Sequence, residues 1–164
     1  MQLLSFEYLY AGKLCAALDR QHPRDLYDVK LLLNNEGLSE KLKTALLVYL
    51  VAHNRPMAEL LDPNLSDIRQ AYQAEFEGMV LGEVTLAELE QVRLDLIALI
   101  KQRLTDKDKH FILSVKRRKP QWDYLGLNHI SNLPGVRWKM QNLAMMEDNK
   151  HQQAIAKLEK VLFG

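Results

Sequence analysis

The segment SFEYLYAGKLCAALDRQHPRDLYDVKLLL, residues 5–33, decides the fold. Its apolar residues recur every three or four positions, which is the period of an α-helix, and Ser5 stands where it can cap the first turn. This first helix is expected to end near Arg20. Pro23 then starts a second helix, because a first helical position needs no backbone N–H, and Gly37 closes it as a left-handed cap. The segment predicts two consecutive helices.

The same helical period continues along the rest of the chain. Thr85 followed by Glu88 forms a capping box, a strong helix-start signal, and Thr105 with Asp108 gives a similar start. Further helices are expected to start at Ser39, Ser66, Pro134 and Asp148, with a short helical turn at residues 57–61. Only residues 1–5, MQLLS, have the composition of a strand. We therefore predict an all-α fold: residues 1–164 form a single-domain helical bundle of about seven to nine helices, with at most one short N-terminal strand.

Composition and length describe an ordinary globular chain. Of the 164 residues, 48% are hydrophobic and 26% are charged. The one cysteine, Cys15, lies within a helical apolar pattern, so we expect a buried structural thiol rather than a nucleophile. No secretory signal is visible, and the apolar run at residues 45–53 is too short to span a membrane. We expect a cytoplasmic protein with no membrane partner.

Charge is distributed unevenly between the two halves of the sequence. Residues 1–100 contain nine Lys and Arg against fifteen Asp and Glu, whereas residues 101–164 contain thirteen against six. The basic half indicates either an anionic partner, such as RNA, or attraction between the two halves of the chain. Both interpretations stay open at the level of sequence.

Familiar catalytic signatures are missing from the sequence. It contains no GxGxxG, no Walker loop, no GxSxG and no HExxH. The five histidines lie too far apart to form a local metal site, and none is paired with cysteine at zinc spacing. We therefore predict no metal site in this chain alone.

Lys13 is the first candidate functional residue. It lies seven residues after Phe6 and three after Tyr10, so its side chain follows the apolar stripe of the first helix. One interpretation is that its ammonium group reaches to solvent at the rim of the core. The other is that it contacts a carboxylate or a polyphosphate, for which a compact, mobile cation is well suited.

Three charged residues at the start of the second helix are the next candidates. Asp25 falls near the third helical position, where a carboxylate interacts favourably with unpaired N–H groups. Asp28 follows Arg24 by four residues and can form an ion pair with it along the helix. Local helix chemistry explains each charge separately, but it does not explain why Lys13 and Arg20 lie close by in the sequence.

A basic run at Lys116, Arg117, Arg118 and Lys119 ends another predicted helix. Cations at a helix C-terminus interact favourably with the helix dipole, so a solvated helix end accounts for the run. The alternative is a patch that contacts RNA or phosphate. Trp122 and Tyr124 follow shortly after, either as partners for bases or as packing anchors.

Two stretches of the chain resemble the AbiEii/AbiGii-type nucleotidyltransferase toxins of type IV toxin–antitoxin systems. Residues 4–33, LSFEYLYAGKLCAALDRQHPRDLYDVKLLL, resemble the family's helix of the form xELLAxKLxALxxR followed by RDLYDLxxLL. The stretch LPGVRWKMQNLAMM, residues 133–146, resembles the family's PAVRWKLxNL, which precedes a final helix. The two matches occur in the family's order and bracket nearly the whole chain.

The resemblance implies roles for particular residues. Lys13 matches the lysine of the family's third motif and would contact a nucleoside triphosphate. Asp25 is the best match to the aspartate of the fourth motif, with Arg24 beside it and Asp28 as the alternative. That aspartate would orient the triphosphate or assist deprotonation of the acceptor.

The family's Gly-Ser and Asp-x-Asp motifs, which hold phosphates and a divalent metal on a sheet, are not in this sequence. No Gly-Ser dipeptide occurs, and Asp106-Lys107-Asp108 stands at a helix start rather than on a strand. We therefore expect a truncated or separately encoded C-terminal portion of such a toxin, inactive alone. Mg²⁺ and a nucleoside triphosphate are expected only if an N-terminal catalytic part completes the site.

A second hypothesis is a non-catalytic helical binding module. Its candidate partners are a cognate antitoxin, RNA or a second copy of the chain, and the missing N-terminal domain is a further candidate under the first hypothesis. The basic half of the sequence motivates the RNA version.

Overall fold

The computed structural model describes residues 5–79, 82–126 and 129–164 of the chain. Within them lie nine α-helices and two 3-10 helices and no strand, so the all-α prediction is confirmed. The α-helices are α1 (Phe6–Arg20), α2 (Pro23–Asn35), α3 (Glu40–Ala52), α4 (Met57–Leu61), α5 (Arg69–Glu75), α6 (Leu86–Arg103), α7 (Asp106–Lys116), α8 (Pro134–Met145) and α9 (Asp148–Phe163). The 3-10 helices are η1 (Trp122–Leu125) and η2 (Ile130–Asn132). The strand considered at residues 1–5 falls mostly on residues 1–4, outside the described residues.

Most helix starts use the residues that the sequence indicates. Ser5, Ser39 and Thr85 accept hydrogen bonds from backbone N–H groups of their own first turns, and Thr85 and Glu88 complete the capping box. Thr105 caps α7 in the same way. Gly37 has the left-handed φ of 73° that was expected after the second helix.

Two predicted caps are wrong. Ser66 does not start α5, because its N–H bonds the side chain of Gln21 and the helix begins later, with Ile68 as its cap. Asp148 is the first residue of α9 rather than its cap, which is Glu147 without a side-chain hydrogen bond. A tertiary contact therefore takes the predicted cap of α5, whereas the start of α9 differs from the prediction by one residue.

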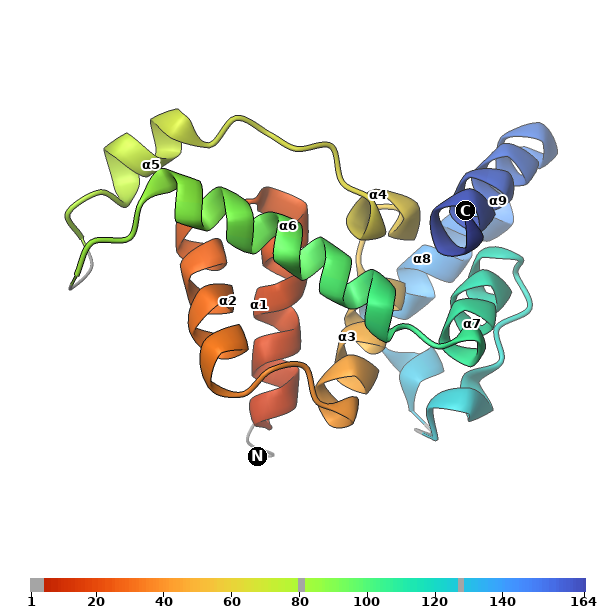
Figure 1. Ribbon diagram of the computed structural model, residues 1–164. Coiled ribbons are helices and arrows are strands. Elements are labelled where there is room, and N and C mark those ends of the chain that lie inside the picture. Colours follow the sequence, from red (N-terminus) through yellow and green to blue (C-terminus); the bar gives the residue numbers. More distant parts are fainter. Residues whose placement is uncertain (1–4, 80–81, 127–128) are drawn as a thin grey trace.

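A contiguous apolar core connects the helices into one domain. Helix α1 packs closely against α3 and beside α2, while the long α6 crosses in front of α1 and α2 in Figure 1. On the other side of α3, helix α8 packs against it, and α9 packs on α7 and α4. Gly135 allows the close approach of α8 to α3, because a Cβ there would lie 2.5 Å from the carbonyl oxygen of Ala52. No helix among the described residues is both long and apolar enough for a membrane crossing.

Candidate functional site

An ion pair joins the two helices that carry the candidate residues. Lys13 on α1 donates from Nζ to Oδ2 of Asp28 on α2 over 3.0 Å. Both side chains are about one-third exposed, at 36% and 37%. The lysine therefore lies neither in the core nor free in solvent, and its charge meets a carboxylate at the surface between the two helices.

Asp25 lies one helical turn before Asp28 and has a different environment. Arg20, at the end of α1, donates to Asp25 Oδ1 over 3.0 Å, and the Asp25 side chain is only 14% exposed. Its other oxygen, Oδ2, is buried and has no hydrogen-bond partner in the described structure. Because buried carboxylate oxygens are normally hydrogen-bonded, this atom has an unused capacity to accept a proton or a hydrogen bond. Local spacing does not indicate the pairing of Arg20 with Asp25, which depends on the turn between the two helices.

The expected ion pair between Arg24 and Asp28 is not formed. Asp28 is engaged by Lys13, and the guanidinium of Arg24 reaches instead toward the carbonyl oxygen of Glu75, at 3.4 Å. The nitrogen Nδ1 of His22 accepts the backbone N–H of Arg24, and Nε2 lies 2.5 Å from a carboxylate oxygen of Glu75. Arg24 therefore helps to attach α5 to the start of α2, apart from the Lys13–Asp28 and Arg20–Asp25 pairs.

Gln21 fixes the turn that brings α1 and α2 together. Its backbone is left-handed, with φ of 53°, and its side chain is almost fully buried. The amide oxygen accepts from Arg93 over 2.9 Å and from the N–H of Ser66 over 3.0 Å, and the amide nitrogen donates to the carbonyl of Asn64. No local sequence signal identifies Gln21, because its partners lie far along the chain and meet it only in the folded state.

The basic run at residues 116–119 is largely used inside the structure. Lys116 is buried, so it is not part of a solvated helix end. Arg118 donates to the carbonyl oxygens of Leu143 and Met146 at the end of α8, over 2.7 Å and 2.8 Å. Arg117 and Lys119 are exposed. Contact of this run with nucleic acid stays a prediction, which now depends mainly on those two residues.

Other cations of the basic half also bind helix C-termini. Lys139 on α8 is buried and donates to the carbonyl oxygens of Leu50 and Arg55 at and after the end of α3, over 3.0 Å and 3.3 Å. Its burial, with the nearby charge of Lys116, lowers its pKa to about 8. A ring nitrogen of His151 lies 2.7 Å from the carbonyl oxygen of Lys116. Part of the positive excess in residues 101–164 therefore satisfies backbone carbonyls rather than facing a partner.

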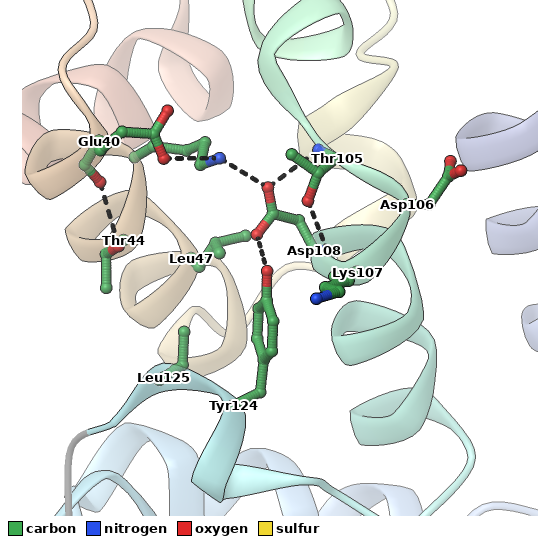
Figure 2. A pocket seen from close by; sticks show the side chains of 10 residues that line it. Glu40, Thr44, Leu47, Thr105, Asp106, Lys107, Asp108, Tyr124 and Leu125 are labelled. Atoms are coloured by element: carbon green, nitrogen blue, oxygen red, sulfur yellow. Dashed lines mark hydrogen bonds and ion pairs between the residues drawn. The ribbon is translucent and has the colours of Figure 1, made fainter.

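The Asp-x-Asp tripeptide at residues 106–108 lies beside a cleft of about 570 Å³ between α3, α7 and η1. Figure 2 shows Asp108 pointing toward Thr105 and Tyr124, with Asp106 directed away. Asp108 Oδ2 lies 2.9 Å from Nζ of Lys43, and the Tyr124 hydroxyl donates to Oδ1 over 2.6 Å. Burial acts to raise the pKa of Asp108, but these hydrogen bonds outweigh it and hold the pKa below its usual value.

The arrangement around Asp108 does not fit a divalent metal. Its carboxylate is 3% exposed and already accepts bonds from Lys43, Tyr124 and the N–H of Thr105. Throughout the described residues, no group of three or more His, Cys, Asp or Glu side chains is placed to hold a metal ion. The aromatic residues that follow the basic run serve as packing anchors here: Trp122 and Tyr124 both pack against Phe111.

Cys15 is confirmed as a buried structural thiol. It is 2% exposed, and burial together with the nearby Asp19 charge raises its pKa to about 12. The reactive thiolate form is therefore strongly disfavoured, which excludes a nucleophilic role for this residue in the structure described.

Comparison with known proteins identifies the family. No curated protein and no solved structure matches the chain. A family model described as "Nucleotidyl transferase AbiEii toxin, Type IV TA system" matches residues 1–142, which include α1, α2 and most of α8. The match thus covers the first stretch on which the resemblance rests and residues 133–142 of the second. The chain belongs to the AbiEii family of nucleotidyl transferase toxins.

Proposed function

We propose that this chain supplies the helical half of a nucleotidyl transferase site, with Lys13 binding the triphosphate of a nucleotide. The observation that carries the proposal is the 3.0 Å contact between Lys13 and Asp28. This contact brings together α1 and α2, the helices that match the family's third and fourth motifs. The family match supports the same two helices.

The chemistry of Lys13 suits a triphosphate. Its ammonium group is partly exposed, so it can exchange its carboxylate partner for phosphate oxygens at little desolvation cost. Asp28 holds the ammonium group of Lys13 at the surface between α1 and α2 while no nucleotide is bound. Asp25, with one oxygen bound to Arg20 and the other unused, can orient the bound nucleotide or accept a proton from the acceptor.

The described residues do not fit the divalent metal that such chemistry uses. In phosphoryl transfer, Mg²⁺ bound by carboxylates neutralises charge on the phosphates. Asp108 is committed to Lys43 and Tyr124, and the sequence offers neither a Gly-Ser dipeptide nor a second Asp-x-Asp. We propose that the chain is inactive alone and needs a separate part that carries those motifs, as expected for a C-terminal portion of the toxin.

Incubation with a labelled nucleoside triphosphate, Mg²⁺ and RNA tests this claim. The chain alone should transfer no label to RNA, and label transfer should require an added protein that carries the Gly-Ser and Asp-x-Asp motifs. Metal-dependent label transfer by the chain alone would show that the claim of inactivity is wrong.

Triphosphate binding by Lys13 has its own test. In calorimetric titration of the chain with a nucleoside triphosphate, Lys13→Gln should weaken binding by about tenfold or more, because a charge-assisted contact is lost. Lys41→Gln, which removes an exposed lysine on α3, is the matched control and should bind as the unmodified chain does. Equal binding by Lys13→Gln and the unmodified chain would remove Lys13 from the site.

A non-catalytic binding module is the second candidate function, and the surface of α1 favours it. Phe6 and Leu9 are 44% and 50% exposed and share a helix face with Lys13. Such a face suits a protein partner, for which the candidates are a cognate antitoxin, the part with the missing motifs or a second copy. Light scattering of the chain alone tests for a second copy, because self-association gives the mass of a dimer. A monomer mass leaves the antitoxin and the part with the missing motifs as candidates. We also propose that the protein is located in the cytoplasm.

A further inference from the structure

A groove between α7 and α9 lies away from the candidate site. Its volume is about 410 Å³. It is formed where the two helices pack against each other, and it opens beside the last turn of α9. The lining side chains are those of His110, Leu113, Arg117, Ala156, Glu159, Lys160 and Phe163.

Phe163 gives this groove an exposed aromatic wall. The side chain is 47% exposed although it is large and apolar. The His110 ring lies 5.4 Å from it between centroids, and Nζ of Lys109 lies 5.4 Å from the centre of the Phe163 ring. A flat ring beside cations is the arrangement on which nucleobases stack, because every base offers a π-face.

The charge of the groove is positive. Glu159 has the one acidic side chain among the described residues that line it, and Arg117 forms an ion pair with it. Gly164, the last residue of the sequence, also lines the groove and adds its α-carboxylate. Lys160 at the wall and Lys109 over the ring add two cations, which exceed that one further carboxylate. An anion that enters the groove therefore meets a net positive potential.

This groove combines cations that are separated in the sequence. The continuous run at residues 116–119 is the obvious basic segment, but Lys116 is buried and Arg118 bonds the end of α8. Arg117 is the member of that run that lines the groove, where it meets side chains of α9. The α7–α9 groove thus places an exposed aromatic ring beside cations from two helices, without the buried ion pair that occupies the cleft at Tyr124.

We propose that the α7–α9 groove binds a single strand of nucleic acid. One base stacks on Phe163, and the adjoining phosphates contact Lys160 and Lys109. No buried hydrogen-bonding side chain lines the groove in the described structure, so the binding is expected to depend on salt and to discriminate little between bases. This inference does not rest on the triphosphate site at Lys13.

Fluorescence anisotropy of the full chain with a labelled short oligouridine tests the proposal. At about 50 mM salt the unmodified chain should bind, and Phe163→Ala should weaken the affinity about 5-fold to 150-fold through the loss of stacking. Phe163→Tyr keeps a stacking ring and should retain binding. Lys160→Gln should lower the slope of log affinity against log salt by about 0.7, the value for one phosphate contact on a single strand.

Lys150→Gln removes an exposed lysine from the opposite end of α9 and serves as the charge-matched control. It should leave both the affinity and the salt slope close to those of the unmodified chain. Circular dichroism of each variant confirms that the helical content is kept. The proposal is overturned if oligouridine does not bind at low salt, if Phe163→Ala and Lys160→Gln bind like the unmodified chain, or if Lys150→Gln weakens binding as much as Lys160→Gln.

Discussion

Two lysine–aspartate pairs of nearly equal length have opposite surroundings. Lys13 and Asp28 lie 3.0 Å apart with about one-third of each side chain exposed, whereas Lys43 and Asp108 lie 2.9 Å apart and are 6% and 3% exposed. The first pair connects two helices at the surface, and the second connects α3 to the start of α7. Both pairs consist of an ammonium group and a carboxylate, so the difference between them is their exposure to solvent.

Burial determines what each pair can do. The exposed pair is screened by water and contributes little to stability, which leaves Lys13 free to change partners. The buried pair has lost most of its hydration, so Lys43 depends on Asp108 and Glu40, while Asp108 depends on Lys43 and the Tyr124 hydroxyl. Hydrogen bonds and charges of Glu40 and Asp108 outweigh the effect of burial and raise the pKa of Lys43. Distance alone therefore does not identify a functional pair.

The largest expected effect is that of removing one member of the buried pair. Asp108→Ala leaves the ammonium of Lys43 without its buried partner and removes the Asp108 half of the capping box that starts α7. It should lower the free energy of unfolding by about 3–5 kcal/mol. Urea denaturation followed by circular dichroism measures this change.

The matched substitution at the exposed pair is Asp28→Ala, which should cost at most about 1 kcal/mol because water compensates Lys13. Similar losses of stability for Asp108→Ala and Asp28→Ala would break the distinction between the two pairs.

The contact of α8 with α3 at Gly135 should tolerate additional volume less well than the contact of α1 with α3 at Gly12. Gly135→Ala places a Cβ 2.5 Å from the backbone oxygen of Ala52, so the helices must separate, and we expect a loss of about 1–3 kcal/mol. In Gly12→Ala the new Cβ lies 3.2 Å from the hydroxyl of Tyr49, a side chain that can move. Thermal unfolding of both variants should show a clearly lower Tm only for Gly135→Ala.

Lys139 is a buried lysine that forms no ion pair with a carboxylate among the described residues. Its contribution to the pH dependence of stability should differ from that of both lysine–aspartate pairs. Its pKa of about 8 in the folded chain lies below the ordinary 10.5. Between these values the unfolded chain holds a proton that the folded chain lacks, so stability should rise with pH. From pH 9.0 upward the raised pKa of Cys15 acts in the opposite direction. Unfolding in urea should therefore show a gain of about 1 kcal/mol between about pH 8 and 9.

The variant Lys139→Met tests the origin of this gain. Its overall stability is expected to change, but the quantity of interest is the slope of stability against pH, which should become smaller. Lys116 adds a gain of the same sign, because burial also lowers its pKa. An unchanged slope in Lys139→Met would assign the pH dependence to other groups.

The smallest expected effect is the interaction energy of the exposed pair. A double-mutant cycle with Lys13→Gln and Asp28→Asn should give a coupling of about 0.2–1 kcal/mol in urea unfolding. A coupling of several kcal/mol would mean that the surface pair stabilises the fold as Lys43 and Asp108 do. It would argue against the proposal that Lys13 exchanges Asp28 for the phosphates of a nucleotide.

The helices were largely predictable because their signals are local. Capping residues such as Thr85 and the period of apolar residues both act within a few positions. The exceptions are tertiary: Ser66 has the side chain of a cap, but its N–H is taken by Gln21, whose position depends on the turn between α1 and α2. Sequence periodicity contains no information about that contact.

The candidate site was predictable only in part for the same reason. The family resemblance placed Lys13 and Asp25 together, but local spacing suggested Arg24 as the partner of Asp28, and the structure gives Lys13 instead. The groove at Phe163 was not predicted, because its cations come from α7 and α9 and no continuous segment contains them. Local charge patterns show which residues carry charge, whereas the fold decides which of those charges remain available.

The side chains of Lys139 and His151, which bind helix C-termini, have a consequence for how the molecule unfolds. Lys139 and His151 come from α8 and α9, and their acceptors are carbonyls at the ends of α3 and α7. Opening either C-terminal helix therefore exposes unpaired carbonyls in the helix to which it is bonded, so unfolding of one segment destabilises the next. Hydrogen exchange should accordingly show the amides of α3 and α8 opening together, and those of α7 and α9 opening together. A protease cut between η1 and α8 should release no stably folded fragment.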